Sequence, residues 1–81
     1  MLFVTLLSPK GKGTEAVRYL KELKAPPGIT IRDVYFTFGR YDGIVVLEAR
    51  DANTAMNFIM EMAFATDYTA ETLMAVPAKE L

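Results

Sequence analysis

Two short segments of this chain, residues 2–7 and 44–47, are apolar at nearly every position. Both are rich in Val, Ile and Leu, which is typical of β-strands. A strand covered on one side alternates apolar and polar side chains, whereas an almost uninterrupted apolar run indicates burial on both faces. The two segments therefore predict two central strands of a sheet that needs cover on both of its sides.

The small size of the chain makes this cover essential. A chain of 81 residues buries only about 60% of the surface that its unfolded form exposes, so the isolated domain is marginally stable. Small domains commonly gain stability from disulfides, metal ions or association. The sequence contains neither Cys nor His. We therefore expect no disulfide, no metal site and no cofactor, and association is the remaining route.

Charge and hydropathy restrict the classes of partner. Nine basic and ten acidic residues nearly cancel, whereas nucleic-acid binding requires a basic surface. The apolar run at residues 1–7 is far too short to span a membrane, and it lacks the basic flank of a signal peptide. We therefore expect a cytoplasmic protein that binds neither nucleic acid nor membranes.

Turn-forming residues divide the rest of the chain into further strands and helices. Residues 25–28, with two prolines and a glycine, end one helix, and residues 39–43 connect two strands tightly enough for a hairpin. Asp51 or Asn53 is the expected N-cap of a second helix. The predicted strands are residues 2–7, 29–38, 43–49 and 68–76, and the predicted helices are residues 14–24 and 53–65.

The order strand, helix, hairpin, helix, strand predicts a single α+β domain over residues 1–81. The commonest solution for this order is the ferredoxin-like βαββαβ fold, a four-stranded antiparallel sheet of order 4-1-3-2 with both helices on one face. This order puts the two continuously apolar strands at the centre. Because two helices cover only one face, we expect the sheet of a second copy to cover the other. The predicted partner is therefore the chain itself, as a homodimer or a higher homo-oligomer.

The second predicted helix is apolar around most of its circumference. Asn53, Asn57 and Glu61 recur every four residues and form one narrow polar stripe. We expect a helix of this kind to be covered on more than one side. Its large apolar side chains are Met56, Phe58, Ile59, Met60, Met62 and Phe64.

The hairpin register decides which side chains face the second copy. If Gly39 pairs with Asp42, the side chains separate into a mixed face and an apolar face, and a shift of one residue would exchange the two faces. Tyr35, Thr37 and Glu48 then line the contact between copies, either as ordinary hydrogen-bonded interface groups or as a ligand site. The face expected to meet the partner carries Asp33, Tyr35, Thr37, Ile44, Val46 and Glu48, and the face expected under the helices carries Val34, Phe36, Phe38, Val45 and Leu47.

Three loops gather at one end of the predicted sheet, at residues 10–13, 39–42 and 66–68. The first precedes a helix, where unpaired N–H groups and the helix dipole attract anions. Lys10 and Lys12 add positive charge, so a small carboxylate or phosphate is a candidate ligand there. Glycines at alternate positions also occur in plain loops, which is the competing interpretation.

The turn of the hairpin concentrates polar groups. After Gly39 it carries a cation, a phenol and a carboxylate, at Arg40, Tyr41 and Asp42. These groups are candidates to orient a polar ligand or to act as acid and base. The alternative is structural: Asp42 bonds its own turn backbone, and Tyr41 seals the end of the sheet.

The hairpin also resembles a known family. The run Phe-Gly-Arg-Tyr-Asp-Gly-Ile-Val-Val-Leu-Glu-Ala at residues 38–49 resembles the hairpin that gives the GYD-domain family its name. The run Glu-Thr-Leu-Met-Ala-Val-Pro at residues 71–77 resembles that family's last strand. The hairpin is also similar to that of the ligand-sensing domain of Lrp/AsnC-type regulators, where it lies near an effector site between subunits. The resemblance implies a dimeric α+β barrel of two stacked sheets, and it implies little about activity.

The leading functional hypothesis is a non-catalytic homo-oligomer that binds a small polar metabolite at or near the subunit interface. One alternative is a small cofactor-independent enzyme, monooxygenase- or isomerase-like as in related barrels, with Tyr35, Tyr41, Asp42 or Glu48 as acid and base. Glu48 and Glu71 are a candidate carboxylate pair on the same face. A purely structural assembly module is the third possibility. The candidate ligand-binding residues are Tyr35, Thr37, Gly39, Arg40, Tyr41, Asp42 and Glu48, with Lys10 and Lys12 as candidates for an anion.

Overall fold

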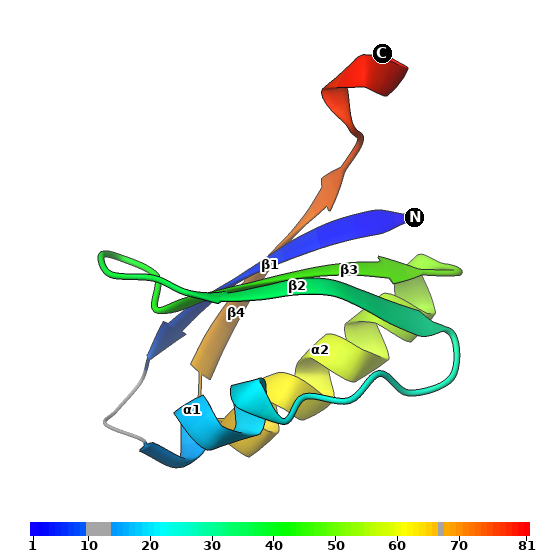
Figure 1. The fold of residues 1–81 in the computed structure, drawn as a ribbon. Helices are drawn as coiled ribbons and strands as arrows, with labels where there is room; N and C mark the ends of the chain where they lie inside the picture. The colour runs from blue at the N-terminus through cyan, green and yellow to red at the C-terminus, as the bar shows by residue number, and fades with distance from the viewer. Residues whose placement is uncertain (10–13, 67) are drawn as a thin grey trace.

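The chain forms two layers, a four-stranded antiparallel sheet and two helices packed on one of its faces (Figure 1). The structure is a computed structural model and describes residues 1–9, 14–66 and 68–81. The strand order β2-β3-β1-β4 is the predicted order 4-1-3-2 read from the other edge, so the ferredoxin-like fold is confirmed. The elements are β1 (Leu2–Pro9), α1 (Thr14–Lys21), β2 (Ile29–Phe36), β3 (Gly43–Ala49), α2 (Ala52–Thr66), β4 (Tyr68–Ala75) and the 3₁₀ turn η1 (Ala78–Glu80).

The hydrophobic core lies between the sheet and the helices, and the two central strands supply much of it. Val45 and Leu47 of β3 and Leu7 of β1 have no exposed surface. Thr5, two positions before Leu7 on β1, is also fully buried. Its hydroxyl lies 3.1 Å from that of Thr72 on β4. The helices contribute Leu20, Ala55, Phe58, Ile59 and Met62 to this core.

Helix α1 and strand β2 are each shorter than predicted. Helix α1 ends at Lys21 instead of residue 24 because the chain tightens there: the Leu23 N–H donates to the Leu20 carbonyl three residues earlier, at 3.4 Å. Strand β2 ends at Phe36 instead of residue 38. The Thr37 N–H donates to the Asp42 carbonyl at 2.9 Å, which closes the turn before Phe38 is reached.

The hairpin register differs from the predicted one by two residues. Tyr35 pairs with Ile44 and Phe36 with Gly43, whereas pairing of Gly39 with Asp42 would have matched Phe36 with residue 45. A shift of two residues leaves every side chain on its predicted face, so the division of the strand residues between the two faces is correct. The ladder also contains an irregularity at Arg32, between Ile31 and Asp33.

The prediction that Phe36 and Phe38 lie under the helices is wrong. Val34, on the same face, packs against the core, whereas Phe36 is 48% exposed and Phe38 is completely exposed. The reason is position along the hairpin, because the turn projects past the end of the sheet that the helices cover (Figure 1).

The prediction that α2 is covered on more than one side is also wrong for the single chain. Its inner side chains, including Phe58, Ile59 and Met62, are buried, but the outer stripe of Met56, Met60 and Phe64 is 46%, 50% and 82% exposed. These three residues are spaced by four, so they form one continuous line on the helix. Within the part of the chain that the structure describes, neither helix has the length and apolarity that crossing a membrane requires.

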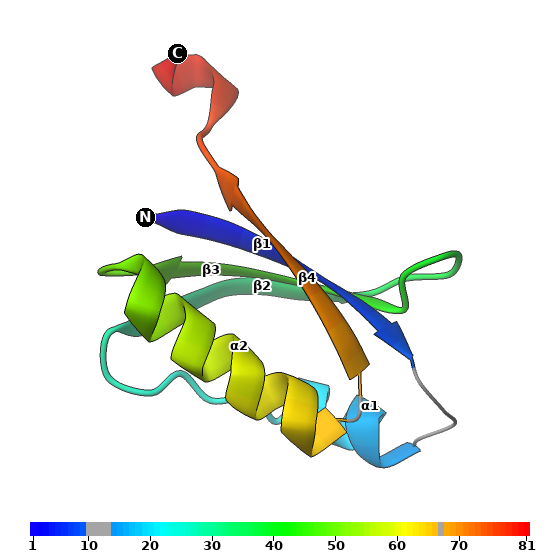
Figure 2. The same ribbon diagram turned by 180° about the vertical axis from the view of Figure 1, so that it is seen from behind.

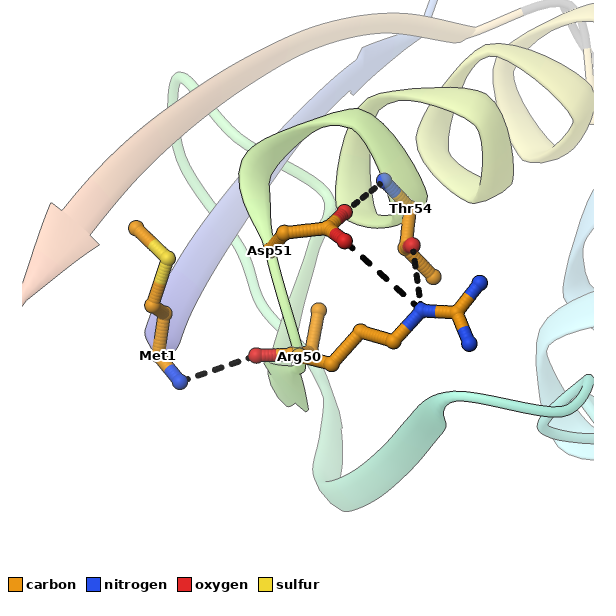
Figure 3. Close-up of polar contacts among 5 residues, drawn as sticks. Met1, Arg50, Asp51 and Thr54 are labelled. Atoms are coloured by element: carbon orange, nitrogen blue, oxygen red, sulfur yellow. Dashed lines mark hydrogen bonds and ion pairs between the residues drawn. The ribbon is translucent and has the colours of Figure 1, made fainter.

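Asp51 is the N-cap of α2, as one of the two predicted alternatives. Its Oδ1 accepts a hydrogen bond from the Thr54 N–H at 2.7 Å, and the Arg50 Nε donates to the Thr54 hydroxyl at 3.2 Å (Figure 3). The bonds from Thr54, and secondarily the Arg50 charge, lower the pKa of Asp51 below its ordinary value of 3.8. Next to this cap, the Met1 ammonium donates to the Ala49 carbonyl at 2.8 Å.

We expect Asp51→Ala to lower the melting temperature by a few degrees, because the first turn of α2 loses its capping acceptor. A lowered folded-state pKa means that the contribution of Asp51 is present above pH 3.8 and is lost as the pH falls through the lower folded value. Thermal unfolding at pH 7 and at about pH 3 measures both effects. In the control Asp51→Asn, an acceptor remains at neutral pH and the acid-dependent part disappears. An unchanged melting temperature for Asp51→Ala would contradict this role.

The face of the sheet opposite the helices is uncovered in the single chain, and we call it the open face. Figures 1 and 2 show both helices on one side of the sheet. The register places four apolar side chains of the central strands together on the open face: Val4 pairs with Val46 and Leu6 with Ile44. All four are partly exposed. The sheet therefore has an apolar centre on the side that no helix covers.

Candidate functional site

Polar groups from the hairpin turn, β1 and β4 meet at one end of the sheet. Figure 1 shows the β2–β3 turn at this end and both termini of the chain at the other. The Asp42 N–H donates to the Leu7 carbonyl at 2.8 Å, which ties the turn to β1. Pro9 at the end of β1 pairs with Tyr68 at the start of β4. Two of the three predicted loops are thus together, and the third, residues 10–13 with Lys10 and Lys12, lies outside the described residues.

A hydrogen bond between Tyr41 and Glu71 is the central feature of this site. The Tyr41 hydroxyl donates to Glu71 Oε2 at 2.6 Å, a short distance typical of a bond to a carboxylate. Glu71 lies on β4 opposite Leu6 of β1, which puts it on the open face. Tyr41 comes from the hairpin turn, so the bond bridges elements that are 30 residues apart in the chain.

The environment of Tyr41 keeps its phenol protonated. The hydrogen bond to Glu71 is the largest cause that raises the pKa of Tyr41 above 10.0, followed by desolvation and the Glu71 charge. The guanidinium of Arg40 acts in the opposite direction. At neutral pH Tyr41 is therefore a hydrogen-bond donor between a carboxylate and a guanidinium, and it is not a base.

Thr37 and Gly39 serve the turn itself. The Thr37 hydroxyl donates to the Tyr41 carbonyl at 2.6 Å, which uses its only proton inside the hairpin. Gly39 has a φ of +140°, a backbone conformation that residues with a Cβ rarely adopt. The Ser8 hydroxyl reaches the Arg40 carbonyl at 3.5 Å from β1. Thr37, Gly39 and Ser8 thus hold the backbone that presents Tyr41.

Glu48 lies on the open face but far from the turn. It pairs with Leu2 of β1, whereas Glu71 pairs with Leu6, and four positions along a strand correspond to roughly 13 Å. The two carboxylates therefore share a face, as expected, but do not form a pair. Glu48 instead forms an ion pair with the guanidinium of Arg32 on β2. The structure thus separates Glu48 from the turn residues with which the sequence grouped it.

Tyr35 is closer to the turn and 52% exposed on the open face, opposite Ile44. The structure therefore brings together Tyr41, Glu71 and Arg40, whereas Tyr35 lies on β2, at the opposite edge of the sheet from Glu71 on β4. Glu71 is the residue that sequence reasoning did not include in the ligand site. The sequence did place Glu71 on a strand that pairs with β1. Its hydrogen-bond partner, Tyr41, could be assigned only once the register of that pairing was known.

The other side of the same turn carries a shallow groove of about 250 Å³. Tyr68 lies in it almost completely buried, and burial raises the pKa of its phenol, with a smaller contribution from the Asp42 carboxylate. Asp42 thus lies on the helix side of the turn, whereas Tyr41 reaches the open face. The groove is lined by Val17, Phe36, Thr37, Phe38, Asp42 and Tyr68.

The donors and acceptors of the site suit a small polar molecule. The Glu71 carboxylate can accept further hydrogen bonds besides the one from Tyr41, and Arg40 adds a positive charge beside Tyr41. Among residues 1–9, 14–66 and 68–81, no three His, Cys, Asp or Glu side chains gather closely enough to hold a metal ion.

Comparison with known proteins links the whole chain to one family. The model of the GYD domain matches residues 5–81. The crystal structure of hypothetical protein PHS023 from Pyrococcus horikoshii is similar in fold, with a TM-score of 0.68 and 23% sequence identity. The similarity covers 95% of this chain and 92% of that protein. No curated protein sequence matches the chain.

Proposed function

Because the chain belongs to the GYD-domain family, we propose that it works as a homodimer with its two open faces stacked in an α+β barrel. In this proposal each subunit binds a small polar metabolite beside the Tyr41–Glu71 pair, at the edge of the interface, without converting it. The bond between Tyr41 and Glu71 at 2.6 Å is the observation that carries the ligand part.

The apolar centre of the open face supports the dimer. Val4, Leu6, Ile44 and Val46 lie side by side on the two central strands, and no helix covers them. Burial of apolar surface stabilises an interface by a free energy of about 25 cal/mol per Å². The sheet of a second copy carries the same apolar side chains, so each copy covers the apolar centre of the other, as a two-fold symmetric interface requires.

The polar edge of the open face supports a ligand in addition to a partner. Stacking a second sheet would remove water from around Glu71, and a buried carboxylate is costly unless every lone pair is satisfied. A carboxylate accepts about four hydrogen bonds, and Tyr41 donates only one of them to Glu71. A ligand with an amino or hydroxyl group would supply further donors. Arg40 beside Tyr41 favours a ligand that also carries a carboxylate, such as an amino acid or a hydroxy acid.

Binding is better supported than acid–base catalysis by the same pair. A general base works best with a pKa near the operating pH, whereas the pKa of Tyr41 is raised above 10.0. The chain also contains no His or Cys to serve as base or nucleophile. The cofactor-independent enzyme therefore remains the second candidate.

The test is a thermal-shift screen of the full chain against amino acids, hydroxy acids and small organic acids. A ligand at one hundred times its dissociation constant stabilises the folded state by about 2.7 kcal/mol, which raises the melting temperature of a domain of this size by roughly 10 °C or more. If no compound shifts the melting temperature at millimolar concentration, the ligand part of the proposal is wrong. A stable dimer without any ligand would then favour a structural assembly module.

For any compound that binds, we expect Tyr41→Phe and Glu71→Gln each to weaken affinity by roughly tenfold or more, because each loses a charge-assisted hydrogen bond. Isothermal titration calorimetry measures the change. The matched control is Glu61→Gln, which removes a carboxylate from the exposed side of α2 and should leave affinity unchanged. Equal affinities for Glu71→Gln and Glu61→Gln would place the ligand elsewhere.

A further inference from the structure

The last six residues, 76–81, leave the sheet on the side away from the helices, and we call them the C-terminal arm. Figures 1 and 2 both show the chain after β4 rising away from the sheet on the side opposite the helices. The arm folds on itself: the Glu80 N–H donates to the Pro77 carbonyl at 2.9 Å and the Leu81 N–H to the Ala78 carbonyl at 3.1 Å. None of the three residues of η1 is buried.

The arm carries apolar side chains that its own chain does not cover. Val76 is 56% exposed and Leu81 is 94% exposed. Single apolar side chains on a surface are common, but these two lie on a short segment that projects from the body. Their exposure indicates a contact that the single chain cannot make.

The arm is continuous with the open face. A notch of about 280 Å³ lies where the two meet. Anything that stacks on the open face at this end therefore contacts the arm as well. The notch is lined by Met1, Leu2, Glu48, Ala75, Val76, Pro77 and Glu80.

We infer that the C-terminal arm packs against a second copy of this chain, with Val76 and Leu81 covering apolar surface of the partner. This inference rests on the proposed face-to-face dimer, because the arm stands on the side that the partner would occupy. In a two-fold symmetric dimer each subunit contributes one arm, so each arm contacts the other subunit at an equivalent position. The arm thus extends the interface beyond the sheet.

Photo-cross-linking tests the contact directly. The chain has no Cys, so a Leu81→Cys variant has a single thiol that can be labelled with benzophenone maleimide. Irradiation of the labelled protein should yield covalent dimers on a denaturing gel. The matched control is Phe64→Cys, whose side chain is 82% exposed on the helix side and should yield none. Cross-linking from both positions, or from neither, would overturn the inference.

Removal of the arm provides a second measurement. A chain that ends at Ala75, and so lacks the whole arm, should dissociate at least tenfold more readily in sedimentation equilibrium, with an unchanged circular dichroism spectrum, whereas Lys79→Ala should dissociate like the unaltered chain. If the unaltered chain dimerises but truncation has no effect and position 81 does not cross-link, the arm inference fails and the dimer stands. If the unaltered chain is a monomer at micromolar concentration, both the dimer and the arm contact are wrong.

Discussion

Leu47→Ala is expected to lower the free energy of unfolding by about 2–5 kcal/mol. Leu47 is fully buried at the centre of β3, between the sheet and the helices, so truncation leaves a cavity that a rigid strand cannot close. Small domains have a total stability of only about 5–15 kcal/mol, and this one lies at the small end of the size range. The variant should therefore retain only a small margin of stability.

Urea denaturation followed by circular dichroism measures this loss. The comparison should be made at one protein concentration, because a dimer is more stable at higher concentration. Met60→Ala is the control, since Met60 is 50% exposed on the outer stripe of α2 and its truncation should change stability by less than about 0.5 kcal/mol. Equal losses for the two variants would show that the core is not where the structure puts it.

Val46→Asp is expected to prevent association while the subunit stays folded. Val46 lies on the open face, opposite Val4, and a symmetric interface would contain the new carboxylate twice. An unpaired carboxylate in an apolar interface is strongly unfavourable, so the dissociation constant should rise by roughly a hundredfold or more. Sedimentation velocity at micromolar concentration should show a monomer.

The neighbouring position provides the matched control. Val45 points to the opposite face of the same strand and is fully buried under the helices, so Val45→Asp should unfold the chain. Circular dichroism separates the two outcomes, because only Val46→Asp should keep a native spectrum. A Val46→Asp protein that still dimerises would show that the open face is not the interface.

Much of the fold could be predicted because the informative residues act locally. Nearly uninterrupted apolar runs identified the two central strands, and Pro26, Pro27 and Gly28 separated α1 from β2. The hairpin register was two residues in error because the turn could close at several lengths, and only the bond from Thr37 to Asp42 fixes it. Phe38 was misplaced for a different reason, since an apolar side chain carries no information about where the covering helices end.

The candidate site was predicted only where it is contiguous in sequence. The cluster of Arg40, Tyr41 and Asp42 was evident, but the structure sends Tyr41 to the open face and Asp42 to the groove beneath the turn. Glu71 could not be joined to Tyr41 from the sequence, because their contact depends on the order of strands and on the pairing of β1 with β4. Long-range pairs of this kind are fixed by topology and not by local pattern.

The hydroxyl pair of Thr5, which is fully buried, and Thr72, which is half-buried, has a consequence for how reliably the chain folds. β1 and β4 come from opposite ends of the chain, 67 residues apart at this pair, so their alignment is the slowest kind of contact to find. A misalignment of one residue would move every side chain of β4 to the opposite face of the sheet. A misalignment of two residues would put Ala70 or Met74 opposite Thr5. The buried Thr5 hydroxyl would then have no hydrogen-bond partner, at a cost of about 1–3 kcal/mol. A single polar pair in an apolar layer thus discriminates against incorrect closure of the sheet.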